Sequence, residues 1–375
     1  MKKRSLIIAL TVGIVVFYAC KKSTSGPEPS PTPGAFDKVA MLTDYADKII
    51  IPGYSTMQQK ILALQVASDA FLAAPSTATQ AAVKTAYTDV HLQYVRIAAF
   101  QFGPAETNLL DVFANFSGGL DYSFTTAGQL TGFSIDSSTI ENNISSGTYD
   151  LTLMSRSSLY SQGFPAINYL FFGPNAIAKF NSNTANRVKY AKAIIARLKS
   201  LVDTVANGWT TYRSEFISNT KTNAGSPIGN LVNQFAYQID LLKGPRIGWP
   251  FGKQSNGSLF VSKTEAYFAG ISTALAIENL SALKNTFTGG GSGKGMSDYL
   301  VALNKAALNT DVLAQFDVAL AKLRLVPDPL SSSLTSHSAE VDQAYKEIQK
   351  LLTLLKTDVA SATAVQITFV DNDGD

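Results

Sequence analysis

The segment from Arg187 to Phe216 constrains the fold more than any other part of the chain, because its apolar residues recur every three or four positions without a miss. That spacing places them in one stripe along a single face of an α-helix. The stripe consists of Val188, Ala191, Ile195, Leu198, Val202, Val205, Trp209, Tyr212 and Phe216. A helix with such a stripe must bury it against other helices, so the segment predicts a helical bundle.

The same spacing recurs in most of the remaining chain. Before residue 180 it predicts helices over 36–51, 56–73 and 79–101, with a stop at Pro52-Gly53. After residue 186 it predicts helices over 187–216, 227–242, 264–287, 297–308, 311–325 and 339–360. We therefore expect an all-α fold of two helical-bundle domains, each similar to a four-helix bundle, over 36–180 and 181–375.

Three stretches lack this spacing. Residues 108–152 are rich in Gly, Ser, Thr and Asn, and predict a long irregular excursion with short helices or strand pieces. Residues 243–262 contain four glycines and two prolines, and predict an ordered loop or a hairpin. Near the C-terminus, Val365, Ile367 and Phe369 alternate with polar residues, which predicts one short strand.

The N-terminus has the pattern of a bacterial secretion signal. Lys2, Lys3 and Arg4 precede an apolar run over 5–18 that is too short to span a bilayer comfortably as a helix. Residues 1–19 are expected to be a signal peptide, and Cys20 stands where a bacterial lipoprotein carries its acylated cysteine. Residues 20–35 are expected to comprise this lipidated cysteine and a Pro/Ser-rich tether. An ordinary cleaved signal with an unmodified Cys20 is the alternative.

Charge and cysteine content exclude some partners and some means of stabilisation. The full chain has a formal net charge of +3 at pH 7. Removal of residues 1–19 takes away three cations and no acidic residue, so the mature chain is formally neutral. No nucleic-acid partner is therefore expected. Cys20 is the only cysteine, so the fold must rest on its core without an intramolecular disulfide.

The inventory of catalytic side chains is short. The two histidines, His91 and His337, lie on separate predicted segments without a partner at metal-ligand spacing, and both are interpreted as packed or solvated. No HExxH motif, GxSxG elbow, P-loop or dinucleotide fingerprint occurs. Asp371, Asp373 and Asp375 resemble the start of a calcium loop but lack its closing glutamate, so they are interpreted as a solvated end.

Aromatic residues gather around the Gly/Pro-rich stretch 243–262, close in sequence to Arg246 and Glu265. They are Tyr237, Trp249, Phe251, Phe260, Tyr267 and Phe268. One interpretation is a loop held against two helices by these rings. The other is an aromatic-lined pocket with one cation and one anion, in which Arg246, Glu265 and Tyr267 are the candidate contacts.

The densest apolar run of the mature chain, residues 163–173, reads GFPAINYLFFG. It resembles the signature segment of the imelysin-like family, which includes insulin-cleaving membrane peptidases and carries GxHxxE in a context such as GFHAIEYLLFG. AAFQFGPAE (98–106), NRVKYAKAIIARLKSLVDTVANGW (186–209) and EAYFAGISTALAIENLSALKNTFTG (265–289) also resemble family segments. The resemblance covers essentially all of residues 36–375.

The resemblance implies an all-helical, two-domain fold with the motif facing a cleft between the domains. It also implies a periplasm-facing location at the outer membrane, a link to iron uptake and, for some members, peptidase activity. Gly163 of the motif is kept, but Pro165 replaces the family histidine and Asn168 the family glutamate. Ala98 replaces an acidic residue before the AFxFGP segment. Because proline has no ligand atom and a neutral amide is a weak ligand, the family metal site is expected to be lost, and no cofactor is predicted.

These observations lead to one main functional hypothesis and two alternatives. The main hypothesis is a cell-envelope lipoprotein that acts as a non-catalytic binding module linked to iron or haem uptake. It would be anchored through Cys20 to the outer membrane and face the periplasm or the cell surface. Its ligand is expected near Asn168, Arg246 and Glu265. The alternatives are a divergent metallopeptidase with ligands drawn from elsewhere and a structural interaction protein of the envelope.

Overall fold

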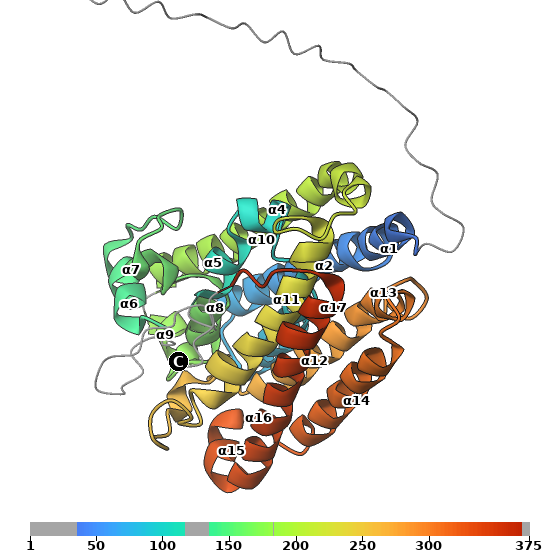
Figure 1. Ribbon diagram of the computed structural model, residues 1–375. Helices are drawn as coiled ribbons and strands as arrows, with labels where there is room; N and C mark the ends of the chain where they lie inside the picture. The colour runs from blue at the N-terminus through green and yellow to red at the C-terminus, as the bar shows by residue number, and fades with distance from the viewer. Residues whose placement is uncertain (1–35, 117–134, 183, 370–375) are drawn as a thin grey trace, which may run out of the picture. The chain divides into compact units, whose positions relative to one another are not determined.

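The computed structural model describes residues 36–116, 135–182 and 184–369, and Figure 1 shows them as an assembly of helices. The predicted signal peptide, Cys20 and the tether lie outside the described residues, as do Asp371, Asp373 and Asp375. Residues from Phe36 onward form one compact unit. The regular elements in the described ranges are all helical, which confirms the all-α class. The predicted domain boundary at residues 180 and 181 stays a prediction.

The first helices run continuously through a proline. α1 (Lys38–Asp44) is capped by Asp37, whose Oδ1 accepts a hydrogen bond of 2.9 Å from the N–H of Ala40. A π-helical turn, η1 (Tyr45–Ile50), leads directly into α2 (Ile51–Ala73). The predicted stop at Pro52-Gly53 is therefore wrong. Pro52 stands at the start of α2, after the wider π-turn, where the helix tolerates its ring and its missing N–H.

The next helices connect the first pair to the motif segment. α3 (Thr77–Arg96) begins with a capping box of Ser76 and Thr79, packs against α2 and buries its predicted stripe. The 3₁₀ turn η2 (Ala98–Phe100) follows. Short helices then occupy the described parts of the predicted excursion and its flanks: α4 (Pro104–Thr107), α5 (Leu110–Asn115), α6 (Ser137–Ser146), α7 (Arg156–Leu159), α8 (Gly163–Phe172) and α9 (Ala176–Ser182).

The predicted long helix is present as α10 (Thr184–Ser218), a helix of 35 residues. It contacts α1, α2 and α8, so it buries its apolar stripe against several earlier helices. The Trp209 ring is fully buried, with its centroid 6.4 Å from that of Tyr54 and 5.7 Å from that of Phe102. The stripe from Val188 to Phe216 is thus confirmed as a packing face.

The Gly/Pro-rich stretch differs from its prediction at both ends. α11 (Pro227–Leu241) continues directly into a π-helix, η4 (Leu242–Gly248), so the loop predicted from residue 243 begins as helix. Turns follow, with a 3₁₀ turn η5 (Val261–Lys263). The helix predicted from residue 264 starts only at Ser272 (α12, Ser272–Phe287), because residues 264–271 form turns with positive φ at Ala266 and Gly270.

The last helices form a bundle with α11 and α12. They are α13 (Met296–Ala302), α14 (Ala306–Leu323), α15 (Leu330–Ser336), α16 (Ser338–Thr353), η6 (Leu354–Val359) and α17 (Ala360–Thr363). α14 packs on α12 and α16, and α16 packs on α11. His337 occupies the N-cap position of α16, but its side chain makes no capping hydrogen bond there. None of the described helices is both long enough and apolar enough to cross a bilayer.

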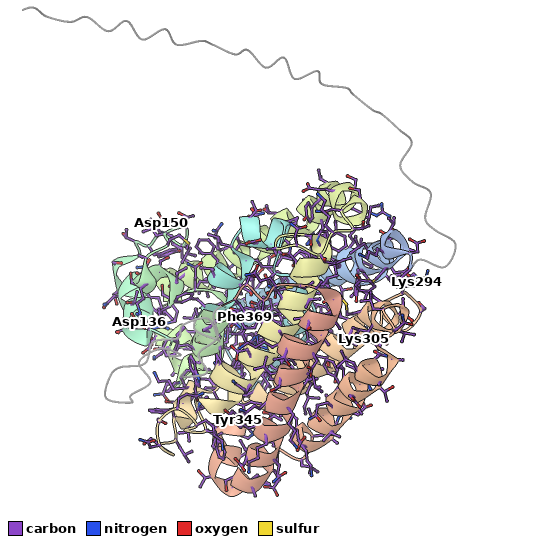
Figure 2. The ribbon with its side chains drawn as sticks, viewed as in Figure 1. Asp136, Asp150, Lys294, Lys305, Tyr345 and Phe369 are labelled. Carbon is purple, nitrogen blue, oxygen red and sulfur yellow. The ribbon has the colours of Figure 1, made fainter. Side chains whose placement is uncertain are left out.

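The predicted C-terminal strand is wrong, because residues 365–369 are irregular. The side chain of Asn233 in α11 forms hydrogen bonds with the backbone of these residues, as a neighbouring strand would have done. Its Nδ2 donates a hydrogen bond of 2.9 Å to the carbonyl oxygen of Gln366, and its Oδ1 accepts one of 2.7 Å from the N–H of Thr368. A strand requires the backbone of a neighbouring strand, and the described ranges contain none. Figure 2 labels Phe369 at the end of this segment.

Candidate functional site

The motif helix α8 rests directly on the end of α5. Gly163 opens α8 with φ = +68°. A Cβ atom at this position would lie 2.1 Å from the carbonyl oxygen of Ala114. Glycine is therefore required for both the backbone conformation and the close approach of the two helices. The approach holds Asn115, which follows Ala114, beside the motif helix.

The two substituted motif positions have structural roles. Pro165 is half-buried in the first turn of α8, where its missing N–H has no cost. Asn168 lies three residues further along and is buried. Its Oδ1 accepts a hydrogen bond of 2.8 Å from the backbone N–H of Ala269. The Asn168 side chain therefore ties α8 to the turn segment 264–271.

This turn segment brings Glu265 into a group of buried polar side chains. Glu265 Oε1 lies 3.3 Å from His91 Nε2, and Glu265 Oε2 lies 3.3 Å from Arg246 Nε. Asn115 Nδ2 donates a hydrogen bond of 2.8 Å to Glu265 Oε1. No more than 6% of any of these four residues is exposed. We call His91, Asn115, Arg246 and Glu265 the buried cluster.

His91 is a candidate site residue that the sequence interpretation missed. It is buried, but it also has polar partners: its Nδ1 lies 3.2 Å from the Tyr87 hydroxyl. Its ring stacks on Phe164 of the motif helix, with centroids 4.2 Å apart and an interplanar angle of 5°. The local signal in the sequence is its position next to the apolar stripe of α3. That signal does not indicate Glu265 as a partner, because Glu265 lies far along the chain.

The Glu265 carboxylate is stabilised in its ionised form. Burial by itself would raise its pKa, but the charge of Arg246 and the interactions with His91 and Asn115 lower the pKa of Glu265 to about 2. Removal of either partner of a buried ion pair leaves an uncompensated charge, which typically costs about 3–5 kcal/mol. The Arg246–Glu265 pair is therefore expected to hold η4 and the turn segment together.

A second carboxyl group lies beside the buried cluster. The Tyr94 hydroxyl donates a hydrogen bond to Asp111 Oδ1. Burial raises the pKa of Asp111 to about 6, although the Tyr94 hydrogen bond and the charge of Arg246 act in the opposite direction. Burial also raises the pKa of Tyr94 well above its usual range, so the phenol keeps its proton. Asp111 therefore changes charge close to neutral pH.

A small cavity adjoins these groups, between α3, α5, α11 and η4. It is lined by Tyr94, Ala98, Asp111, Asn115, Gln238, Leu241 and Arg246. The centre of a water molecule has about 10 Å³ in which to move, which is room for about one water. Ala98 stands where the GxHxxE proteins carry an acidic residue, so it contributes no charge to the cavity lining.

Four buried polar atoms on the cavity's lining residues have no hydrogen-bond partner among the described residues. They are Arg246 Nη1, Asn115 Oδ1, Gln238 Oε1 and Arg246 Nε, the last of which forms the ion pair with Glu265. Buried donors and acceptors are nearly always paired in folded proteins. Beside the ion-paired Arg246 Nε, the Nη1 donor and the two acceptors on the lining of one small cavity therefore indicate a place for a small polar group.

The other predicted contacts lie apart from this arrangement. Tyr267 is half-buried, with its ring 5.1 Å from that of Phe268, and it neither lines the cavity nor bonds to Glu265 in the described contacts. Trp249 is buried, and Tyr237 packs its ring on Phe369 at 5.5 Å. The structure thus brings together Arg246 and Glu265 of the predicted pocket, but not Tyr267.

The residues at the motif do not fit the metal site of the GxHxxE pattern. Pro165 has no ligand atom, and Asn168 Oδ1 already accepts the Ala269 N–H. In the described ranges, no three His, Cys, Asp or Glu side chains are placed to hold one ion. The geometry supports no reaction step that uses such a metal at these positions.

Known proteins share this fold. A solved structure from Parabacteroides distasonis, assigned as an iron-regulated protein A precursor, superposes with a TM-score of 0.71 at 17% identity, covering 90% of this chain and 97% of the other. An imelysin-like protein from Psychrobacter arcticum gives 0.67 at 15% identity, covering 89% and 97%. The search of curated proteins found no match. The sequence model of the imelysin family matches residues 50–358, and this chain therefore belongs to the imelysin family.

Proposed function

We propose that this protein is a non-catalytic binding protein and that it holds a small polar ligand at Arg246, beside the buried cluster. The main support for the absence of catalysis is the identity and the contacts of the residues at the two motif positions. Pro165 offers no ligand atom, and Asn168 uses its Oδ1 to hold the Ala269 N–H. The motif helix thus contributes packing and a backbone clamp, while the pair of groups that would bind a metal or activate a water is missing from it.

The polar atoms beside the cavity favour binding over hydrolysis. Arg246 Nη1, Asn115 Oδ1 and Gln238 Oε1 are buried and unpaired among the described residues. An unpaired buried donor or acceptor costs about 1–3 kcal/mol, so a ligand that pairs with it gains that amount over one that does not. Such atoms select a ligand by its hydrogen bonds.

A link to iron or haem uptake forms part of the proposal. The membership of the imelysin family supports it, together with the P. distasonis protein, whose name describes an iron-regulated protein. The cavity has room for about one water, so formate, the smallest carboxylate, is the probe for Arg246, because a carboxylate accepts charge-assisted hydrogen bonds from a guanidinium. Ferric citrate and haemin are far larger than this cavity, and they probe the link to iron or haem on the protein as a whole.

Calorimetric titration of the purified protein with formate tests the site, and separate titrations with ferric citrate and haemin test the link to iron or haem. We expect saturable binding of formate and of at least one of the two iron compounds. Arg246→Lys keeps the charge but removes the planar donor fork, so it should bind formate at least about tenfold more weakly. Arg324→Lys, at an exposed position, is the matched control and should bind like the wild type. No binding of formate, or equal binding of formate by Arg246→Lys, would contradict the proposed site, and binding of neither ferric citrate nor haemin would contradict the link to iron or haem.

A cleavage assay tests the non-catalytic assignment. The purified protein is incubated with a denatured protein substrate, with and without added Zn²⁺. We expect no fragments beyond those of the protein-free control. Cleavage that a chelator abolishes would instead support the divergent metallopeptidase.

We also propose that the protein is an envelope lipoprotein of the outer membrane, anchored through Cys20. Support comes from the cations at positions 2–4, the apolar run over 5–18 and the single cysteine that follows. In a bacterial host, Cys20→Ser should abolish incorporation of labelled palmitate and move the protein from the membrane fraction to the soluble fraction. Unchanged fractionation of Cys20→Ser would refute the anchor.

A further inference from the structure

The turns after η4 form one wall of a second pocket, which shares no lining residue with the cavity at Arg246. Its volume is about 580 Å³, within the size range of small-molecule sites. Phe251, Lys253 and Leu259 line it from the turns. Leu334 of α15, together with Ser338 and Asp342 of α16, lines it from the opposite side.

The pocket has an apolar floor that is partly open to solvent. Leu334 is buried and Phe251 is half-buried, whereas 41% of Leu259 is exposed. Covering apolar surface stabilises a complex by about 25 cal/mol for each Å² removed from water. A ligand with an apolar body would therefore gain free energy by covering Leu259 and Phe251.

The wall formed by the turns is already ordered. The N–H of Gly257 donates a hydrogen bond of 2.9 Å to the carbonyl oxygen of Gly252, and the N–H of Phe260 donates one of 2.8 Å to that of Pro250. Gly252 has φ = +81°, which closes the turn. Because these bonds exist before a ligand arrives, binding requires little further ordering of the chain.

Two ammonium groups share the single carboxylate of the pocket lining. Asp342 accepts hydrogen bonds from two ammonium groups: its Oδ1 lies 2.5 Å from Lys253 Nζ, and its Oδ2 lies 2.7 Å from Lys346 Nζ. The Asp342 carboxylate is therefore shared between Lys253, which lines the pocket, and Lys346, which does not.

Lys253 is the cation that lines the pocket, and aromatic rings fix its position. Its Nζ lies 5.2 Å from the ring centroid of Phe251 and 4.9 Å from that of Tyr345, which Figure 2 labels on α16. An ammonium group has three N–H donors, and Asp342 takes one of them. Lys253 can therefore donate to a further anion without breaking its ion pair.

We propose that this pocket binds a small amphipathic anion, a carboxylate with an aliphatic or aromatic body. The carboxylate pairs with Lys253 near the Ser338 hydroxyl, and the body covers Phe251, Leu259 and Leu334. This binding is independent of the ligand proposed at Arg246, since the two sites share no residue.

Titration of the intact protein with octanoate, followed by ligand-observed NMR, tests the proposal. Octanamide is the matched neutral probe, with the same body and no charge. We expect saturable binding of octanoate and at least about tenfold weaker binding of octanamide, because a hydrogen bond to a charged group contributes about 1.5–3 kcal/mol.

Paired variants locate the site. Lys253→Met keeps an aliphatic stem but removes the charge, and should weaken octanoate binding at least about tenfold. Lys346→Met removes the other ammonium group that pairs with Asp342. Because Lys346 does not line the pocket, this variant should change binding by no more than about twofold. Leu259→Ser should weaken binding about threefold to tenfold, whereas Leu325→Ser, at another exposed leucine, should not.

These substitutions are at solvent-exposed or partly exposed side chains, and melting temperatures establish that each variant is folded. The absence of saturable octanoate binding to the wild type would overturn the proposal. Equal weakening by Lys253→Met and Lys346→Met would also overturn it, because the charge effect would then not belong to the pocket.

Discussion

Single side chains decide how the motif segment of this protein works. Gly163 permits a contact with α5 that no other residue allows, and Asn168 replaces an expected acid with a backbone clamp. His91 approaches the same segment from α3 and stacks on Phe164. The motif is therefore a junction at which α3, α5 and the turn segment 264–271 meet.

Gly163→Ala tests this junction. The new Cβ would stand 2.1 Å from the Ala114 carbonyl oxygen, and the positive φ would add strain. We expect a loss of about 2–4 kcal/mol in the free energy of unfolding, measured by urea denaturation. Gly225→Ala is the matched control, with φ = +77° and nothing within 4 Å of its Cβ, and should lose only about 1 kcal/mol. Equal losses would show that the close approach is unimportant.

Asp111 and Glu265 affect stability in different pH ranges and with opposite signs. The pKa of Asp111 is about 6 in the folded protein, against an ordinary value of 3.8. Between these values the folded protein holds a proton that the unfolded chain releases, so stability falls as the pH rises from about 4 to 6. The pKa of Glu265 is about 2, against 4.5, so its contribution is lost as the pH falls from about 4.5 to 2.

Asp111→Asn should remove the first of these effects and leave the second. The amide oxygen can still accept the hydrogen bond from the Tyr94 hydroxyl, so the substitution changes the charge more than the packing. Relative to the wild type, the variant should gain on the order of 1–3 kcal/mol as the pH rises from 4 to 6. Urea denaturation at several pH values measures the free energy of unfolding of each protein, and Asp311→Asn, at an exposed position, is the control. Parallel stability curves for Asp111→Asn and the wild type would refute the assignment.

The elements show why proline and glycine mislead local prediction here. η1 and η4 are π-helical turns, and each adjoins or contains a proline, Pro52 or Pro245. The wider turn absorbs a residue that an α-helix would not, so the chain continues as helix through an apparent stop. η4 is also the element that presents Arg246 to Glu265. Helical continuity at Pro245 is therefore part of how the site is built.

Asn233 of α11 hydrogen-bonds the C-terminal segment. Asn233→Ala removes three hydrogen bonds to residues 366–368: one to the carbonyl oxygen of Gln366, and those from the N–H and the hydroxyl of Thr368. We expect the Thr368 amide to exchange with solvent at least about tenfold faster, because each such bond contributes about 1 kcal/mol. Hydrogen exchange measured by mass spectrometry detects the change. Asn230→Ala, one helical turn earlier on α11, is the control, and an equal effect there would mean that the bonds of Asn233 are not the cause.

Across the molecule, residues far apart in the chain are joined directly. The N–H of Lys294, labelled in Figure 2, donates a hydrogen bond of 2.7 Å to Asp44 Oδ2, and that of Met296 donates one of 2.9 Å to the Tyr45 hydroxyl. α2 packs on α10, and α3 packs on α12. With such contacts between early and late helices, we expect residues 36–375 to unfold as one cooperative unit.

The two tryptophans can report on this cooperativity. Trp209 lies in α10 against Tyr54, and Trp249 follows η4. Trp209→Phe and Trp249→Phe each leave one fluorophore, and each variant should show the same urea midpoint by fluorescence as by circular dichroism. A fluorescence midpoint that differs from the circular dichroism midpoint within one variant would indicate separately unfolding domains, as the sequence-based division at residue 180 predicts.

Much of the helical content could be predicted from residue spacing. The stripe of α10 and that of α3 are local patterns, and both lie mostly in the core as expected, although Val188 and Tyr212 of α10 are half-buried. The predicted strand at residues 365–369 fails for a non-local reason, because Asn233 supplies the bonds that a partner strand would have made. The predicted helix start at residue 264 fails because residues 264–271 form turns, and Asn168 Oδ1 accepts a hydrogen bond from the Ala269 N–H within them.

By itself the sequence determined the helical class, the family and the loss of two motif side chains, because periodicity and residue identity are properties of the local chain. The tertiary structure alone decided that Glu265 meets His91, Arg246 and Asn115, since these residues come from four separate elements. It also decided the charge states of Asp111 and Glu265. A pKa depends on burial and on neighbouring charges, which exist only once the chain has packed.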